Sequence, residues 1–213
     1  LRRIALLLIL PGLGACSSSM MGGVPASQAM GQADWAFAAD AIHLLVQASP
    51  QLNMEQGQPH TLLLGVLQMK DSAPFFKLLA EPDALSMMMA SDHAGDDFIS
   101  LTRYLVVPGQ TASVSLDRAQ QAHFVALIAG YDQLGVKDSV RLFAIPLKLS
   151  SDGIVVKTWQ ASPDRLALQL TLGEHAILAA DQVPFPIDVR NTPVETGDPV
   201  QIPLTGKDTA ATS

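Results

Sequence analysis

Leu166-Ala167-Leu168-Gln169-Leu170-Thr171-Leu172 (residues 166–172) gives the clearest indication of the architecture of this chain. Its leucines occupy every second position, with smaller or polar residues between them. Successive side chains of a β-strand point to opposite faces of a sheet, so this period of two predicts a strand with one buried face. Gly173 follows the last leucine and ends the strand. We expect Leu168 and Leu170 to point into a hydrophobic core.

Other apolar segments of strand length occur on the N-terminal side of this stretch and just after it. Turn residues such as Pro108-Gly109 and Ser151-Asp152-Gly153 separate them. Segment 72–90, with early prolines and apolar residues at helical spacing, predicts a short helical insertion. The sequence therefore predicts a mainly β fold, a β-sandwich of about seven to nine strands with a short helical insertion. Besides 166–172, the expected strands are at about 41–47, 60–69, 99–107, 111–116, 124–131, 140–147 and 176–180.

Composition agrees with one well-filled domain. Of the 213 residues, 48% are hydrophobic and 15% are charged, which suits a single core of ordinary size. The formal net charge of −7 argues against nucleic acid or an anionic membrane surface as the main partner. Cys16 is the sole cysteine, so the domain is expected to lack an internal disulfide.

The first sixteen residues have the organisation of an export signal. Arg2 and Arg3 precede a short apolar run at 4–10. This run is much shorter than the stretch of about 20 apolar residues that is needed to span a bilayer. Leu13-Gly14-Ala15-Cys16 resembles a bacterial lipobox, where the thiol is acylated and the chain is cut before the cysteine. An ordinary secretory signal with an incidental Cys16 is the alternative. Ser17 after the cysteine favours, by the same resemblance, the outer membrane.

These observations divide the chain into four parts. We expect residues 1–15 to be a lipoprotein signal peptide and 16–33 to be a lipidated flexible tether, rich in small residues. The β-sandwich domain then occupies 34–190. Residues 191–213 are rich in Pro, Thr, Asp and Gly without an apolar period, which predicts a disordered tail.

No common catalytic or cofactor motif is found in the sequence, and no cofactor is expected. The five histidines are scattered, without metal-ligand spacing. Asp96-Asp97 is a candidate acid pair for a hydrolase, although a polar loop entering a strand has the same composition. Met87-Met88-Met89 is compatible with a copper site or a partner surface, but packing of a short helix on the sandwich explains it more simply.

The connection from Ser49 to Pro59 (SPQLNMEQGQP) is the candidate binding element. It is longer than the two to five residues of an ordinary hairpin loop. We expect its polar side chains to be solvated and Leu52 and Met54 to act as exposed apolar anchors for a partner. The alternative is that Leu52 packs back onto the sandwich.

Several segments, in this order and spacing, resemble the type VI secretion lipoprotein family (TssJ/VasD-like) over roughly residues 34–180. They are Trp35, the strand about Ile42, 52–53, 59–66 with Gln68, Phe75-Phe76, Pro108-Gly109 and Ala129-Gly130-Tyr131.

The resemblance implies a transthyretin-like β-sandwich without enzymatic activity, anchored by lipid at the periplasmic face of the outer membrane. It also implies membership, with other copies, of a multimeric secretion complex. The implied partner is the periplasmic C-terminal region of a TssM-like inner-membrane protein, bound through the loop between the first two strands. The corresponding residues of this chain are Gln51, Leu52, Asn53, Met54, Glu55, Gln56 and Gly57.

Two other function classes remain open at the level of the sequence. One is a ligand-binding periplasmic β-sandwich lipoprotein for a sugar or peptide, although aromatic residues make up only 5% of the chain and sugar sites usually stack on aromatics. The other is a hydrolase that uses Asp96 and Asp97.

Overall fold

A computed structural model describes residues 23–186, apart from positions 82, 92 and 133–134. The expected signal peptide 1–15, the acylation site Cys16 and the expected tail 191–213 lie outside the described residues. Among the helices that are described, none has the length and apolar character needed to cross a membrane.

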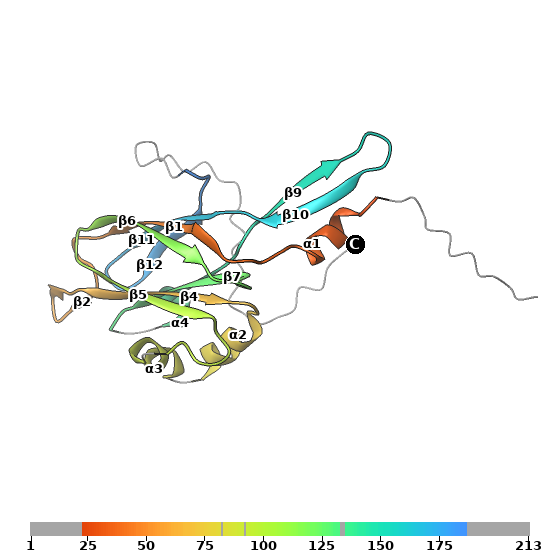
Figure 1. Cartoon of the computed structure of the whole chain (residues 1–213). Helices are drawn as coiled ribbons and strands as arrows, with labels where there is room; N and C mark the ends of the chain where they lie inside the picture. Colours follow the sequence, from red (N-terminus) through yellow and green to blue (C-terminus); the bar gives the residue numbers. More distant parts are fainter. Residues whose placement is uncertain (1–22, 82, 92, 133–134, 187–213) are drawn as a thin grey trace, which may run out of the picture.

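Eight strands form two four-stranded sheets that pack face to face (Figure 1). In the first sheet, with the order β12-β11-β1-β6, β1 is parallel to β11 and the other pairs are antiparallel. The second sheet has the order β5-β4-β7-β8 and is antiparallel throughout. The expected mainly β sandwich is therefore confirmed. Its strands are β1 (Ala38–Ala48), β4 (Leu62–Met69), β5 (Ser100–Val106), β6 (Thr111–Arg118), β7 (Phe124–Gly130), β8 (Val140–Ala144), β11 (Leu166–Leu172) and β12 (Ile177–Gln182).

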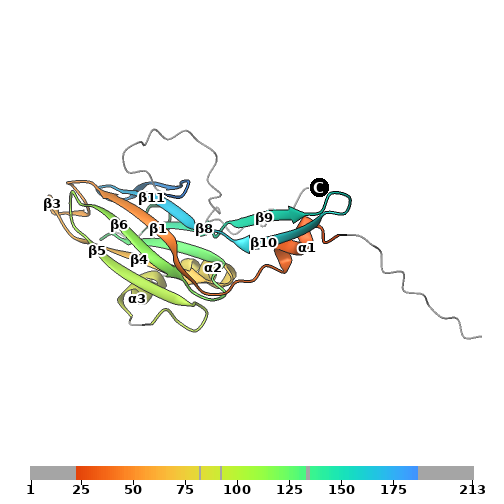
Figure 2. The ribbon, with the colours of Figure 1, turned by 45° about the horizontal axis from the view of Figure 1, so that its top comes forward.

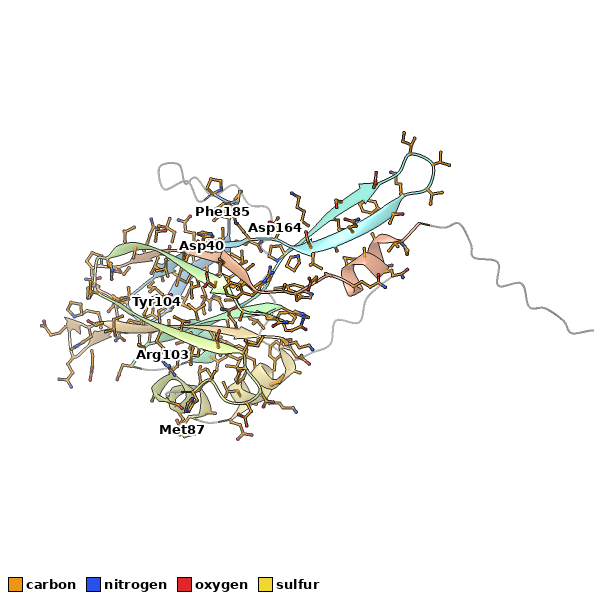
Figure 3. The ribbon with its side chains drawn as sticks, viewed as in Figure 1. Asp40, Met87, Arg103, Tyr104, Asp164 and Phe185 are labelled. Carbon is orange, nitrogen blue, oxygen red and sulfur yellow. The ribbon has the colours of Figure 1, made fainter. Side chains whose placement is uncertain are left out.

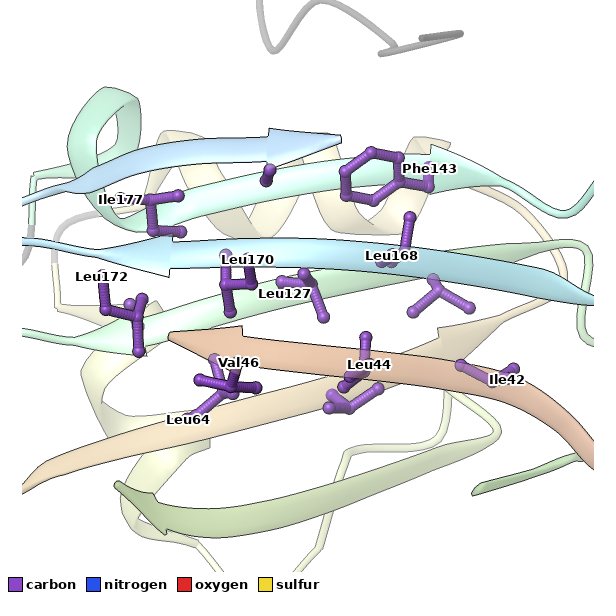
Figure 4. Close-up of a cluster of buried hydrophobic side chains, with 14 of the residues drawn as sticks. Ile42, Leu44, Val46, Leu64, Leu127, Phe143, Leu168, Leu170, Leu172 and Ile177 are labelled. Atoms are coloured by element: carbon purple, nitrogen blue, oxygen red, sulfur yellow. The ribbon is translucent and has the colours of Figure 1, made fainter. Parts of the chain in front are cut away.

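The main core lies between the two sheets, and the leucines of β11 are at its centre (Figure 4). Leu168 and Leu170 are fully buried, as the alternation predicts. They pair in register with Leu44 and Val46 of the neighbouring strand β1. Side chains of the second sheet, among them Leu127, complete the cluster. One sheet thus packs its apolar face on the other.

A second core covers the outer face of the second sheet. Helices α2 (Ala73–Ala80) and α3 (Ala84–Ala90) lie across this face, as Figures 1 and 2 show. Met88 and Met89 are buried there, which confirms the helix-packing interpretation of the methionine run. Because β4 and β7 are covered on both faces, their sequences are apolar without alternation.

Close packing of α3 depends on two residues of the second sheet. A Cβ atom at Gly65 would lie 2.6 Å from the sulfur of Met89, so a larger residue here would displace this buried side chain. The Arg103 guanidinium donates hydrogen bonds to the backbone carbonyls of Met88, Met89 and Ser91 at the end of the helix. These bonds join the C-terminal end of α3 to β5.

The structure differs from the sequence-based expectation at the start of the domain. The expected flexible tether 16–33 contains helix α1 (Ala26–Gly31), so the prediction is wrong for this part. The helix packs beside a hairpin formed by β9 (Leu147–Asp152) and β10 (Thr158–Pro163), and its Ala29 is buried. A contact distant in sequence therefore orders a segment whose own composition favours flexibility.

One expected strand is shorter than predicted, and three short elements are additional. The strand expected at 140–147 ends at Ala144, before Pro146, which lacks the backbone N–H that a sheet ladder needs. Chain reversal after β7 includes the short helix α4 (Val136–Ser139). Strands β2 (Met54–Glu55) and β3 (Gln58–Pro59) form a small hairpin within the connection between β1 and β4.

Leu170→Ala is expected to lower the free energy of unfolding by about 2–5 kcal/mol, because it leaves a cavity in the fully buried centre of the main core. Thermal or denaturant unfolding measures the change. Leu105→Ala is the control, since this leucine of edge strand β5 is 71% exposed. Equal stability of the two variants would contradict the placement of the core.

Candidate functional site

The connection between β1 and β4 is fixed to the sandwich at its first residue. The backbone N–H of Ser49 donates to the carbonyl of Leu172 at 2.8 Å, and its own carbonyl accepts from Gly109 at 3.0 Å. The Ser49 hydroxyl accepts from the backbone N–H of Gln51 at 3.0 Å. Ser49 thus joins the start of the loop to the end of β11 and to the turn between β5 and β6.

Leu52 is part of the main core. Its side chain has 0% exposure and belongs to the cluster between the sheets. Its carbonyl accepts a hydrogen bond from the backbone N–H of His60 at 3.0 Å. The expectation that Leu52 is an exposed anchor for a partner is therefore wrong. The alternative holds, because burying a leucine side chain in the core is favourable by about 1.5–3 kcal/mol relative to leaving it in water.

Asn53 holds the two sides of the loop together. Its backbone has a φ of 49°, a left-handed conformation that asparagine adopts more readily than most residues. Its side-chain amide donates to the carbonyl of Thr61 at 3.3 Å. Its side-chain oxygen accepts from the backbone N–H of Asp132 at 3.1 Å. The loop is therefore bonded both to itself and to the turn that follows β7.

The outermost part of the loop is the hairpin of β2 and β3. Met54 pairs with Pro59 and Glu55 with Gln58. The turn residues Gln56 and Gly57 both have positive φ, 50° and 80°, as a two-residue type I′ turn requires. The loop that the sequence predicts as a polar connection is thus a defined hairpin rather than an irregular segment.

Most side chains of this loop face solvent. Met54 and Asn53 are half-buried, and the polar residues on either side are exposed. His60 and Thr61 belong to the same exposed surface, because β4 begins at Leu62, two residues later than the expected strand 60–69. We call this surface the loop surface. Its exposed members are Gln51, Glu55, Gln56, Gly57, Gln58, Pro59, His60 and Thr61.

Two neighbouring turns support the loop surface. The backbone N–H of Met54 donates to the carbonyl of Glu174 at 3.1 Å. The hydroxyl of Tyr131 donates to the carbonyl of Ala176 at 2.7 Å. Burial raises the pKa of Tyr131 strongly, while a backbone hydrogen bond and the charge of Arg141 lower this pKa by less. The hydroxyl therefore keeps its proton and acts as a donor. The turns after β7 and β11 are thus tied together beneath the loop.

The loop surface lies at one end of the sandwich, and α1 with the β9–β10 hairpin lies at the other (Figures 1 and 2). This arrangement separates the start of the described chain from the candidate binding element.

A groove lies between the edge strands β5 and β6. This groove has a volume of about 550 Å³, and its lining includes Phe37, Gln68, Thr102, Tyr104 and Asp117. Asp96 and Asp97, the candidate acid pair, are exposed and lie outside this lining. Over the described part of the chain, no three His, Cys, Asp or Glu side chains come together in a way that suits a metal ion.

Comparison with known proteins identifies the family. The family described as type VI secretion lipoprotein, VasD, EvfM, TssJ matches residues 40–172, which is more than half of the chain. The chain belongs to the type VI secretion lipoprotein family. The match runs from β1 to the end of β11 and includes the loop surface. This family is a structural component of the secretion system and not an enzyme family. No match is found among curated proteins.

Comparison with solved structures agrees, and the match to TssJ1 shows the same fold. The type VI lipoprotein TssJ1 from Pseudomonas aeruginosa is 23% identical with a TM-score of 0.50, over 68% of this chain and 97% of that one. Lip from Serratia marcescens, a membrane-bound component of the type VI secretion system, is 20% identical with a TM-score of 0.48, over 68% and 97%. A chain in a structure of the TssM C-terminal domain from EAEC is 16% identical with a TM-score of 0.48, over 67% and 97%.

Leu52→Ala in this type VI secretion lipoprotein is expected to lower the free energy of unfolding by about 2–5 kcal/mol, because Leu52 is a core residue despite its position in a polar loop. Gln51→Ala, at the exposed neighbouring position, is expected to change it by less than about 0.5 kcal/mol. Denaturant unfolding of both variants measures the difference. A Leu52→Ala protein as stable as Gln51→Ala would show that the loop is not fastened in the core.

Proposed function

We propose that this lipoprotein is anchored in the outer membrane through acylated Cys16 and docks the periplasmic C-terminal region of a TssM-like inner-membrane protein through the loop surface. It would act as one of several copies in the multimeric secretion complex. The observation that carries the proposal is the placement of the loop surface at the end of the sandwich remote from α1 (Figure 1). A lipid attached near α1 leaves the loop surface directed away from the membrane and towards a partner in the periplasm.

The length of the N-terminal connection supports this orientation. Seven residue steps separate Cys16 from Gly23, the first described residue, and a fully extended chain covers at most about 25 Å over that length. The end of the domain that carries α1 is therefore the end held near the bilayer. Bacterial lipoproteins carry three acyl chains, and stable anchoring takes two or more.

The loop surface suits protein binding for two reasons. Its backbone is held by the hydrogen bonds of Ser49 and Asn53 and by the burial of Leu52, so little conformational freedom is lost when a partner binds. Residues 49–61 contain one carboxylate, Glu55, and no lysine or arginine. A partner surface with basic groups would complement it.

Substitution of exposed loop residues tests the partner contact. We expect Glu55→Arg combined with Gln58→Arg to weaken binding of the TssM-like periplasmic region at least about tenfold, or 1.4 kcal/mol, because both side chains face solvent on the hairpin of β2 and β3. Calorimetric or optical titration gives the dissociation constant. Deleting the loop would be a poorer test, since it removes Leu52 from the core.

Glu81→Arg combined with Ala90→Arg is the matched control. It makes the same change in net charge at exposed positions in the α2–α3 region. Binding should remain at the parent level in this control. An equal loss of affinity in both double variants would indicate a general charge effect. No loss in either variant would place the partner contact elsewhere.

Cys16→Ser tests the anchor independently of the partner. In cells that lack the TssM-like protein, we expect the variant in the soluble periplasmic fraction and the parent protein in the outer-membrane fraction. Fractionation followed by immunodetection distinguishes the two. Recovery of the Cys16→Ser protein with the outer membrane would contradict acylation as the means of attachment.

A further inference from the structure

We propose that the turn of the β9–β10 hairpin, residues 153–156, contacts the lipid bilayer that holds the acylated N-terminus. We call this turn the hairpin tip. The inference rests on the proposed anchor at Cys16 and adds a second contact with the same membrane.

The hairpin tip exposes consecutive aliphatic side chains. Ile154 is 100% exposed, Val155 is 95% exposed and Val156 is 43% exposed. Leu149 on β9 adds a further apolar side chain at 39% exposure. The side chains of this turn project beyond the rest of the domain (Figure 3). Single exposed aliphatic residues are ordinary on protein surfaces, but an apolar cluster at a projecting tip marks a contact surface.

The start of the described chain lies against this hairpin. The backbone N–H of Trp159 donates to the carbonyl of Val24 at 2.9 Å. A Cβ atom at Gly23 would lie 2.0 Å from the carbonyl oxygen of Lys157, so only glycine permits this approach. Lys157 directly follows the hairpin tip in sequence. The chain therefore meets the hairpin next to its apolar turn.

This placement limits the distance between the hairpin tip and the lipid. From Gly23, the chain needs only seven residue steps to reach Cys16, or at most about 25 Å when extended. The acyl chains on Cys16 must lie within a bilayer, so the hairpin tip lies within reach of its surface. It also lies at the end of the sandwich away from the loop surface, as Figures 1 and 2 show.

A bilayer suits the chemistry of this tip better than a protein partner. The tip is a four-residue turn, whereas a stable protein interface uses about 20–30 residues on each side. Its aliphatic side chains would enter the boundary between headgroups and acyl chains. The exposed Lys157, which directly follows the tip, has a long side chain whose amine can remain at the level of the phosphates. The acidic domain as a whole is not attracted to an anionic surface, so the contact is mainly apolar.

A fluorescent label at the hairpin tip tests the contact in the full mature protein. In the acylated protein the sulfur of Cys16 is blocked, so Val155→Cys introduces the only free thiol. An environment-sensitive fluorophore on this thiol is measured in liposomes of phosphatidylethanolamine and phosphatidylglycerol. We expect its emission to shift to shorter wavelength and to be quenched by spin-labelled lipid.

Two controls accompany this measurement. Ala90→Cys places the same label at an exposed position on α3, where emission should stay at its value in water. Adding Ile154→Asp to Val155→Cys should abolish both the shift and the quenching, because a charge at the tip opposes entry into the lipid. Ile154 and Val155 are both exposed, so neither Ile154→Asp nor Val155→Cys disturbs the core.

The outcomes separate this inference from the anchor. Mass spectrometry first establishes whether Cys16 carries acyl chains; a protein without them would contradict the anchor and this inference together. An acylated protein whose tip label remains in water would overturn this inference alone. A shift that arises in concentrated protein without lipid would place a second copy over the tip and would also overturn it.

Discussion

The parallel pairing of β1 with β11 is the interaction on which the rest of the structure depends. It joins residues 42–48 to residues 166–172, and nearly every other strand lies between them in sequence. Such a distant pairing is slow and entropically costly to form, and the burial of the leucines of β11 against the second sheet offsets that cost. Once it is made, the two sheets have a shared core, and the connections between strands collect at two opposite ends.

Those two ends have different chemistry. At one end, Leu52 is buried in the core, and the polar hairpin of β2 and β3 follows it in sequence. Hydrogen bonds of side chains and backbone hold this hairpin in place. At the other end, α1 and the β9–β10 hairpin bring an aliphatic turn close to the start of the described chain. The proposed partner contact would use the first end, and the proposed membrane contact the second.

The sequence predicted the sandwich because its signals are local. The alternation of β11 and the apolar runs of β4 and β7 specify strands wherever they occur. The burial of Leu52 followed from the sequence only as an alternative, because the surrounding residues are polar and its core neighbours come from other strands. Helix α1 and β9–β10 were missed for a related reason: each is ordered by contact with the other, and neither has a clear period of its own. The loop was recognised as the candidate site, but its rigidity depends on Asn53 and Asp132, which are distant in sequence.

Nuclear magnetic resonance can locate the partner contact on the intact domain. The isotope-labelled lipoprotein would be titrated with the periplasmic region of the TssM-like protein while the backbone amide signals are followed. Binding at the loop surface predicts that the largest changes fall in residues 49–61 and in the turns after β7 and β11, with β9–β10 unaffected. Changes centred on the groove between β5 and β6, or on the β9–β10 hairpin, would contradict the proposed division between a partner end and a membrane end.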